Sequence, residues 1–206
     1  MRWSPESNCP DWIESGFGLL KMHLQRLKNS AEYFGFKFEE AEILLHLHEL
    51  EKSFCDSPMR VRLELSRRGK IKVETYKLEN SSQEILKLAL AKAPIDDKNP
   101  FLYHKTTRRE IYEKARESCP GYDDVLLWNE RNEVCEGTLA NIAILEGEIW
   151  WTPPISSGLL PGTFRESLLE SGKIKEKVIH LDELKNAKSI ALFNSVRGWR
   201  LATLDS

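Results

Sequence analysis

The sequence predicts an α+β protein built from two lobes, and three observations support this prediction. Apolar residues recur at helical spacing over residues 20–34, a charged hairpin pattern follows at 61–73, and the second half mixes short strands with short helices. A length of 206 residues suits one large domain or two small lobes. Pro94, two adjacent aspartates and Asn99-Pro100 interrupt residues 88–100. We therefore expect a smaller N-terminal lobe over residues 1–97 and a larger C-terminal lobe over 98–206.

The first helix is expected over residues 20–34, with Gly35 as its stop. Its apolar face comprises Leu20, Leu24, Leu27, Ala31 and Phe34. A second helix is expected over residues 39–54, before the turn Asp56-Ser57-Pro58.

A hairpin is expected next, because Val61, Leu63 and Leu65 alternate with charged residues and Arg68-Gly69-Lys70 forms a turn. Its basic residues suggest an RNA-binding ribbon at first sight. Glutamates interrupt the basic patch and no aromatic side chains are interleaved, so the pattern favours a solvated strand face.

The second lobe is expected to alternate short elements. The predicted helices cover residues 106–116, 161–169 and 182–186, and the predicted strands cover 125–128, 139–145, 148–152, 178–181, 189–193 and 199–204.

The composition is that of a folded protein without a strong charge bias. Lys and Arg total 30 and Asp and Glu total 32, a net charge of −2, which excludes a globally basic nucleic-acid binder. The N-terminus lacks the apolar core of a signal peptide, and prolines interrupt the uncharged stretch 149–164. We expect a soluble cytoplasmic protein with no nucleic-acid or membrane partner.

The cysteines are scattered and form no C-x-x-C pair, and the histidines have no metal-ligand spacing relative to them. This pattern indicates reduced thiols and no metal site.

Lys105 is the first candidate for chemistry. It lies at a predicted strand-to-helix junction in Phe101-Leu102-Tyr103-His104-Lys105, and Arg108 and Arg109 follow within one helical turn. Desolvation and neighbouring cations lower the pKa of a lysine amine and make it a nucleophile. A surface lysine at a basic helix start is the alternative.

Glu136 lies in Val134-Cys135-Glu136-Gly137-Thr138-Leu139-Ala140-Asn141, just before an apolar stretch. A carboxylate held there can keep a heterocyclic nitrogen protonated, the role that an Asp or Glu plays toward pyridoxal phosphate. The alternative is a turn glutamate beside a glycine.

Two turns are candidates for an anion site. The segment 159–165 carries Pro161-Gly162 at a helix entry, where backbone N–H groups and the positive end of the helix dipole suit a phosphate. The segment 193–199 adds amide and hydroxyl donors from Asn194 and Ser195. The alternatives are a plain helix entry and a tight turn at Gly198.

In their order and spacing, these motifs resemble those of the fold-type IV pyridoxal-phosphate enzymes, or class IV aminotransferases, from near Leu20 to the C-terminus. The resemblance implies pyridoxal 5'-phosphate as cofactor, a two-lobe fold like that of D-amino acid aminotransferase, and a homodimer. It implies that Lys105 binds the cofactor as a Schiff base and that Glu136 pairs with the pyridine nitrogen. The phosphate ligands implied by the resemblance are Arg26, on the helix segment 22–31, together with Thr163, Phe164, Asn194 and Ser195.

Within this family, Tyr-His-Lys-Thr-Thr-Arg-Arg and Asn-Ser-Val-Arg-Gly-Trp most resemble the aminodeoxychorismate lyase branch, including lyase halves fused to aminodeoxychorismate synthase. The resemblance implies conversion of 4-amino-4-deoxychorismate to 4-aminobenzoate and pyruvate, a step of folate biosynthesis, and a functional link to the synthase. The candidates for binding the substrate carboxylates are Arg108, Arg109, Arg165 and Arg197.

Two alternatives stay open. An aminotransferase acting on D-amino or branched-chain amino acids shares the same cofactor motifs. A non-catalytic relative is the other, because the family's N-terminal strand and turn are shortened here and Met1–Glu6 resembles only their end. A misassigned start or a partner chain would also account for the missing segment.

Overall fold

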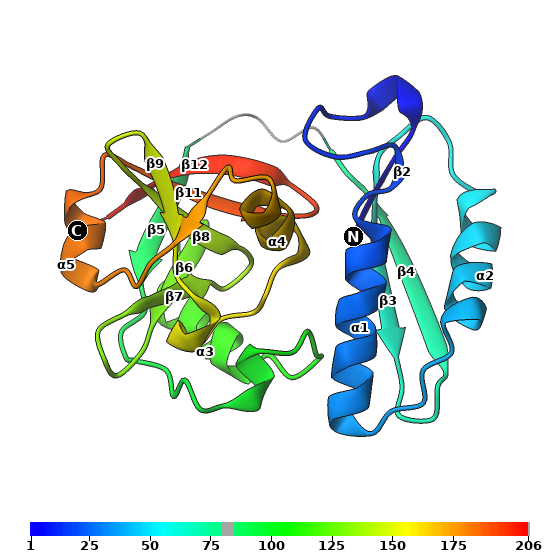
Figure 1. Ribbon diagram of the computed structural model, residues 1–206, viewed down its shortest axis with the longest axis horizontal. Coiled ribbons are helices and arrows are strands. Elements are labelled where there is room, and N and C mark those ends of the chain that lie inside the picture. Colours follow the sequence, from blue (N-terminus) through cyan, green and yellow to red (C-terminus); the bar gives the residue numbers. More distant parts are fainter. Residues whose placement is uncertain (80–84, 206) are drawn as a thin grey trace. The chain divides into compact units, whose positions relative to one another are not determined.

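The computed structural model describes residues 1–79 and 85–205 (Figure 1). The chain divides into two compact units between residues 81 and 82, here called unit 1 and unit 2. The boundary expected after residue 97 therefore falls inside unit 2, because residues 86–90 form a strand of that unit's sheet.

Unit 1 combines an antiparallel sheet with two long helical segments (Figure 1). Its strands run in the order β2-β1-β3-β4. They are β1 (Arg2–Ser4), β2 (Gly16–Phe17), β3 (Met59–Leu65) and β4 (Ile71–Lys77), and the helices are α1 (Leu20–Phe34), α2 (Glu40–Glu51) and the 3-10 turn η1 (Glu6–Asn8). The helix predicted over 20–34 is confirmed at both ends, and the second helix is shorter than its prediction.

Helix α1 ends at Gly35, whose φ of 66° lies in the left-handed region. Its N–H donates to the carbonyls of Ala31 and Glu32, which satisfies groups that the helix end would otherwise leave unpaired. The core of unit 1 joins both helices to the sheet through Leu24, Ile43, Leu47, Val61 and Trp3. Each such side chain contributes about 1.5–3 kcal/mol on burial.

Strands β3 and β4 form the expected hairpin, paired from Met59–Lys77 to Leu65–Ile71. Its charges balance locally. Glu74 lies 2.6 Å from Lys72 and 3.5 Å from Arg62, and Arg62 also pairs with Glu64. Such ion pairs, on a face where Lys72 and Arg62 are exposed, are those of a solvated strand face.

Unit 2 is built on an eight-stranded sheet within the described residues, in the order β10-β9-β8-β11-β12-β5-β6-β7. The strands are β5 (Leu86–Leu90), β6 (Asp124–Trp128), β7 (Val134–Gly137), β8 (Asn141–Glu146), β9 (Ile149–Thr152), β10 (Lys175–Glu176), β11 (Ser189–Asn194) and β12 (Gly198–Leu204). The helical segments are η2 (Pro100–Leu102), α3 (Glu110–Ser118), η3 (Ile155–Ser157), α4 (Thr163–Glu170) and α5 (Leu181–Asn186).

The sheet of unit 2 curls on itself. Strands β7 and β8 stand far apart in the strand order, yet only residues 138–140 join them along the chain. A link this short requires the edge strand β7 to come round toward β8. The curl brings the ends of several strands to one region.

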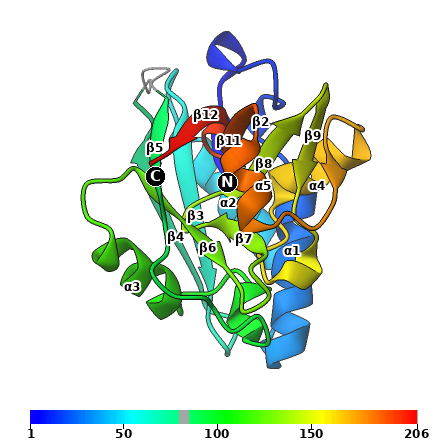
Figure 2. The ribbon, with the colours of Figure 1, turned by 90° about the vertical axis from the view of Figure 1, so that its left-hand side faces the viewer.

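The strands bury side chains on both faces. Leu88 and Leu126 belong to the core inside the curl, whereas Val125 and Leu127 pack with Tyr112 of α3. Helix α3 contacts β6, and α4 contacts β11 (Figure 2). No helix in the described part of the chain is long and apolar enough to cross a membrane.

Four expectations for unit 2 were wrong in detail. Residues 88–90 belong to β5, not to a linker, because β5 pairs in parallel with both β6 and β12. The helix expected from residue 106 begins at Glu110, since the Thr106 side chain accepts the Arg108 N–H at 3.2 Å and competes with helical pairing. The strand expected over 139–145 begins at Asn141, after a separate strand, β7, that the sequence did not predict. The strand expected at 178–181 is replaced by an isolated bridge at His180 and the start of α5.

Candidate active site

Lys105 lies on the loop between η2 and α3, and its side chain is exposed. The preceding residues are held in place. The Asn99 side chain accepts the Phe101 N–H at 3.0 Å, and the Tyr103 hydroxyl donates to the Asp97 carbonyl at 2.5 Å. The amine is thus carried by an anchored segment, but without the desolvation that the sequence suggested.

Glu136 lies on β7 and is 4% exposed. Its Oε1 accepts the Tyr112 hydroxyl at 2.8 Å and the Leu160 N–H at 3.1 Å, and its Oε2 accepts Asn141 Nδ2 at 3.3 Å. Burial raises the pKa of Glu136, whereas the hydrogen bonds from Tyr112 and Leu160 and the positive charges of Lys105 and Arg109 lower it. The carboxylate and the amine therefore act on one another within unit 2.

The loop after Glu136 is fixed by a second buried carboxylate, that of Asp124. Asp124 accepts the N–H groups of Thr138 and Leu139 at 2.9 and 3.2 Å, as well as the Thr138 hydroxyl. Gly137 leaves room for this contact, since a Cβ there would lie 2.8 Å from Asp124 Oδ2. The backbone that leaves Glu136 is therefore rigidly placed.

Helix α4 begins beside this loop. Asn141 Nδ2 donates to the Leu160 carbonyl at 3.0 Å, and a Cβ on Gly162 would lie 2.1 Å from Asn141 Oδ1. Thr163 and Phe164 then form the buried first turn of α4. The positive end of this helix is therefore held next to the residues that hold Glu136, an arrangement that suits an anion.

The turn between β11 and β12 closes on the same loop. Asn194 Oδ1 accepts the N–H groups of Val196 and Arg197, both at 2.9 Å, and Asn194 Nδ2 donates to the Leu139 carbonyl at 3.2 Å. Ser195, half-buried, lies within this turn. The structure thus brings Asn194 and Ser195 to the loop that follows Glu136.

The four candidate arginines divide into two pairs. Arg109 Nη2 donates to the Thr138 carbonyl at 2.6 Å, and buried Arg165 donates to the Pro153 carbonyl at 2.7 Å and pairs with Glu176. Both guanidinium groups donate to partners within the fold, although the buried Nε of Arg165 makes no hydrogen bond in the described part of the chain. Arg108 and Arg197 are exposed, and Arg108 lies over the Phe101 ring at 4.7 Å.

Arg26 belongs to unit 1. It is half-buried on α1, with Nη2 3.4 Å from His23 Nδ1. Its contact with a cofactor phosphate stays a prediction.

Sequence reasoning missed Tyr112, Asp124 and Leu160. Tyr112 lies three residues after Arg109, a spacing that places both on one side of a helix start, but nothing in the sequence connects the phenol to Glu136. Leu160 acts through its backbone N–H, which no residue identity reveals.

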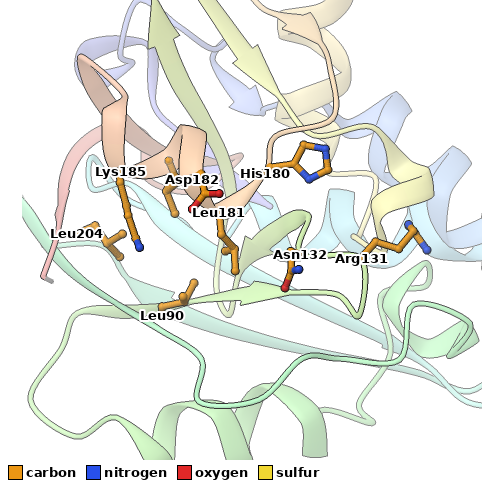
Figure 3. Close-up of a pocket in the computed structure, with 9 residues that line it drawn as sticks. Leu90, Arg131, Asn132, His180, Leu181, Asp182, Lys185 and Leu204 are labelled. Carbon is orange, nitrogen blue, oxygen red and sulfur yellow. The ribbon is translucent and has the colours of Figure 1, made fainter.

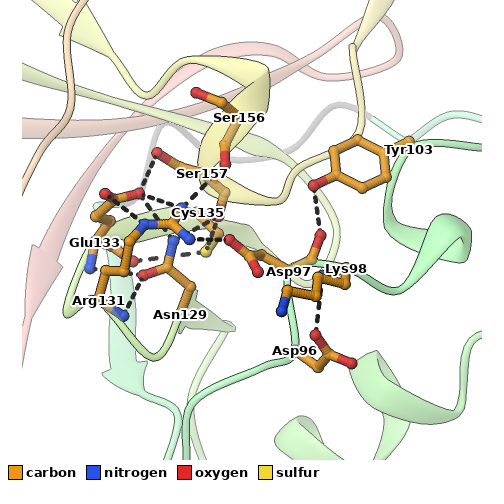
Figure 4. Close-up of polar contacts among 10 residues, drawn as sticks. All are labelled: Asp96, Asp97, Lys98, Tyr103, Asn129, Arg131, Glu133, Cys135, Ser156 and Ser157. Carbon is orange, nitrogen blue, oxygen red and sulfur yellow. Dashed lines mark hydrogen bonds and ion pairs between the residues drawn. The ribbon is translucent and has the colours of Figure 1, made fainter.

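Two other features of unit 2, a cavity and a polar network, lie outside this site. A cavity of about 440 Å³ is lined by residues that include Leu90, His180, Lys185 and Leu204, and no candidate residue lines it (Figure 3). A network around Glu133 links Arg131, Asn129 and Ser157 (Figure 4).

Comparisons with known proteins give one consistent family. The model of the family described as "Amino-transferase class IV" matches residues 13–203. A candidate aminodeoxychorismate lyase of Schizosaccharomyces pombe is 36% identical over 188 residues, which cover 87% of this chain and 80% of that protein. The structure of a candidate amino-acid aminotransferase from Mesorhizobium loti is 35% identical with a TM-score of 0.89, covering 100% of this chain and 97% of that one. The structure of a candidate 4-amino-4-deoxychorismate lyase from Legionella pneumophila is 25% identical with a TM-score of 0.75, covering 90% of this chain and 77% of that one.

The chemistry of the site agrees with these likenesses. An exposed amine, a buried carboxylate that feels its charge and a helix N-terminus suit a cofactor that carries an aldehyde, a basic ring nitrogen and a phosphate. The family match covers most of the chain. The protein belongs to the class IV aminotransferase family and is a pyridoxal-phosphate-dependent enzyme.

Proposed function

We propose that this enzyme is a lyase that converts 4-amino-4-deoxychorismate to 4-aminobenzoate and pyruvate. The observation that carries the proposal is the pair of segments, Tyr103–Arg109 and Asn194–Trp199, that resemble the lyase branch, the first of which bears Lys105. The name of the S. pombe relative, which is matched over 80% of its length, supports the same branch.

The residues of this chain fit the cofactor in distinct roles. Lys105 Nζ would hold it covalently, and Glu136 would accept a hydrogen bond from the protonated ring nitrogen. The phosphate would be held by the α4 N-terminus at Thr163 and Phe164 and by Asn194 and Ser195, and the role of Arg26 stays the prediction that the family resemblance implies. When bound, pyridoxal phosphate withdraws electrons from the substrate carbon that carries the amino group.

The Lys105 amine would take the proton from that carbon. The carbon–oxygen bond to the enolpyruvyl group then breaks, the ring becomes aromatic, and the departing enolpyruvate takes up a proton to give pyruvate. Arg108 and Arg197, both exposed, bind the two substrate carboxylates. Glu136 would keep its negative charge throughout the reaction and so stabilise the proton on the ring nitrogen.

A second candidate is an aminotransferase acting on D-amino or branched-chain amino acids. The observation that favours it is the likeness to the M. loti candidate aminotransferase, which extends over the whole of this chain. Both activities use the same Lys105 and Glu136.

The direct test incubates the enzyme with enzymatically prepared 4-amino-4-deoxychorismate and measures 4-aminobenzoate and pyruvate. We expect both products in equal amounts and no consumption of 2-oxoglutarate. Stoichiometric consumption of 2-oxoglutarate with D-amino or branched-chain amino acids, without 4-aminobenzoate, would instead establish the aminotransferase.

The cofactor assignment has its own test. Borohydride reduction followed by peptide mapping should place the label on Lys105, and Lys105→Ala should lose both the label and the visible absorbance of the bound cofactor. A label on another lysine contradicts the site, whatever the reaction.

We also propose that the enzyme is a homodimer and supplies 4-aminobenzoate for folate biosynthesis downstream of aminodeoxychorismate synthase. The resemblance to the class IV aminotransferases, which implies a homodimer, supports the first point. Analytical ultracentrifugation should give about twice the chain mass of 23.8 kDa.

A further inference from the structure

Tyr112 is a buried phenol on α3 that is 7% exposed. Its hydroxyl donates to Glu136 Oε1 at 2.8 Å, and the Leu160 N–H donates to the same oxygen at 3.1 Å. Two donors converge on one oxygen of the carboxylate. This oxygen is therefore firmly placed.

The other oxygen is held differently. Within the described residues, Oε2 accepts a single long contact of 3.3 Å from Asn141 Nδ2, and the same nitrogen donates to the Leu160 carbonyl at 3.0 Å. Because a carboxylate oxygen has two lone pairs, Oε2 keeps the capacity to accept a strong charge-assisted hydrogen bond.

We propose that Tyr112 is a positioning residue, which anchors Oε1 together with the Leu160 amide and so leaves Oε2 to accept the ring nitrogen of pyridoxal phosphate. This inference rests on the role proposed for Glu136.

The phenol is itself fixed by Arg109. The Arg109 guanidinium lies over the Tyr112 ring at 4.5 Å and donates to the Thr138 carbonyl at 2.6 Å. One side chain therefore links the ring that holds Glu136 to the loop that follows Glu136. The hydroxyl of Tyr112 is the only part of this arrangement that Tyr112→Phe removes, since the ring and its packing remain.

Several charges act on Glu136 from the elements around it. Burial raises the pKa of Glu136, whereas the Tyr112 hydroxyl, the Leu160 N–H and the charges of Lys105 and Arg109 lower it. On the same strand, burial and the Glu136 charge raise the pKa of the Cys135 thiol. Burial and the nearby carboxylate raise the pKa of Tyr112, so it stays a donor over the accessible pH range. Removing this donor raises the pKa of Glu136, because the ionised form loses a hydrogen bond.

The test measures the dissociation constant of pyridoxal phosphate from the cofactor-free enzyme as a function of pH. Binding should weaken at low pH as Glu136 takes up a proton. In Tyr112→Phe we expect affinity at neutral pH to fall about 10-fold, the effect of one hydrogen bond to a charged group. We also expect the midpoint of the low-pH decrease to move to higher pH.

Tyr122→Phe is the matched control, because the Tyr122 hydroxyl also donates to a carboxylate, that of Asp205, at 2.9 Å. Its midpoint should equal that of the wild type. The titration of the cofactor itself is common to all three proteins and cancels in the comparison.

The possible outcomes separate this inference from the proposed function. If borohydride does not label Lys105 in the wild type, the proposed site fails. If Lys105 is labelled but Tyr112→Phe keeps the wild-type midpoint, whether its affinity is unchanged or lower at every pH, the positioning role is overturned.

A second variant covers the case in which Tyr112→Phe does not fold, as judged by circular dichroism. Replacing the Tyr112 side chain with 3-fluorotyrosine keeps the ring and makes its hydroxyl a stronger donor. The midpoint should then move to lower pH, and an unmoved midpoint would likewise reject the proposal.

Discussion

Glu133 and Glu136 are three residues apart, both are at least nine-tenths buried, and the structure treats them in opposite ways. Glu133 pairs with Arg131 through both of its oxygens at 2.9 Å, and Asn129 and Ser157 also donate to Oε2 at 2.9 Å (Figure 4). These contacts lower the pKa of Glu133 to about 2. Glu136 has no such arginine pair among the described residues, and burial raises its pKa.

The difference separates a carboxylate that stabilises the fold from one kept for chemistry. The Glu133 network ties the β6–β7 turn to η3, and through Arg131 to Asp97, whose carbonyl holds Tyr103. It therefore supports the strand that carries Glu136 and the segment that carries Lys105. The Glu133 oxygens already accept hydrogen bonds from Arg131, Asn129 and Ser157, whereas Glu136 can still accept a further hydrogen bond.

The largest effect should come from Glu136→Gln. We expect turnover to fall about 10³-fold, since an amide cannot balance a protonated ring nitrogen. The cofactor-free protein should become more stable at pH 8, because a raised carboxyl pKa lowers the unfolding free energy as the pH rises above about 4.3. Steady-state kinetics and thermal unfolding measure the two effects, and normal turnover would show that the ring-nitrogen role is wrong.

Glu133→Gln should lower the stability of the fold and leave the cofactor bound. We expect the unfolding free energy to fall by about 1–3 kcal/mol, allowing for solvent screening at the half-exposed Arg131. The visible absorbance of the lysine-bound cofactor should persist. Urea unfolding gives the stability, and a variant as stable as the wild type that lost its cofactor would reverse the assignment of the two carboxylates.

The pH dependence sharpens the same contrast. Because the folded pKa of Glu133 lies below its unfolded value, the stabilisation is present above about pH 4.3 and is lost as the pH falls toward 2. The difference in unfolding free energy between the wild type and Glu133→Gln should shrink by about 1–2 kcal/mol over that range. A difference that stays constant from pH 6 to pH 3 would mean that the ion pair does not stabilise the fold.

Gly162→Ala should have the smallest effect and should act on Glu136 through Asn141. The φ of −69° at Gly162 suits alanine, but its Cβ would lie 2.1 Å from Asn141 Oδ1 and displace the amide that contacts Oε2. We expect cofactor affinity to fall about 10-fold, or roughly 1.4 kcal/mol. When Gly162→Ala is added to Asn141→Ala, cofactor affinity should fall little further, because both substitutions remove the same contact between Asn141 and Glu136. If the losses of affinity in the two single variants added in the double variant, Gly162→Ala would act through a contact other than that of Asn141.

Local patterns were sufficient for much of the fold. The helix over 20–34 and its glycine stop follow from the spacing of apolar residues, and the hairpin follows from alternation about a Gly-containing turn. These elements are stabilised by contacts close in sequence. Strand β7 was missed because Glu136 and Gly137 interrupt its apolar pattern, and β5 was missed because its partners, β6 and β12, are distant in sequence.

By itself, the sequence determined the family and the cofactor, because short motifs in a fixed order identify both without any contact being known. Only the tertiary structure decided which polar groups are bonded inside the fold and which are exposed. Arg109 and Arg165 have the same residue type as Arg108 and Arg197, but the first pair donates to Thr138, Pro153 and Glu176, whereas the second pair is exposed. Likewise, the environments of Glu133 and Glu136 differ through partners contributed by other segments. The charge state and orientation of a buried group depend on its neighbours in space, and those neighbours are fixed only when the sheet curls and brings distant loops together.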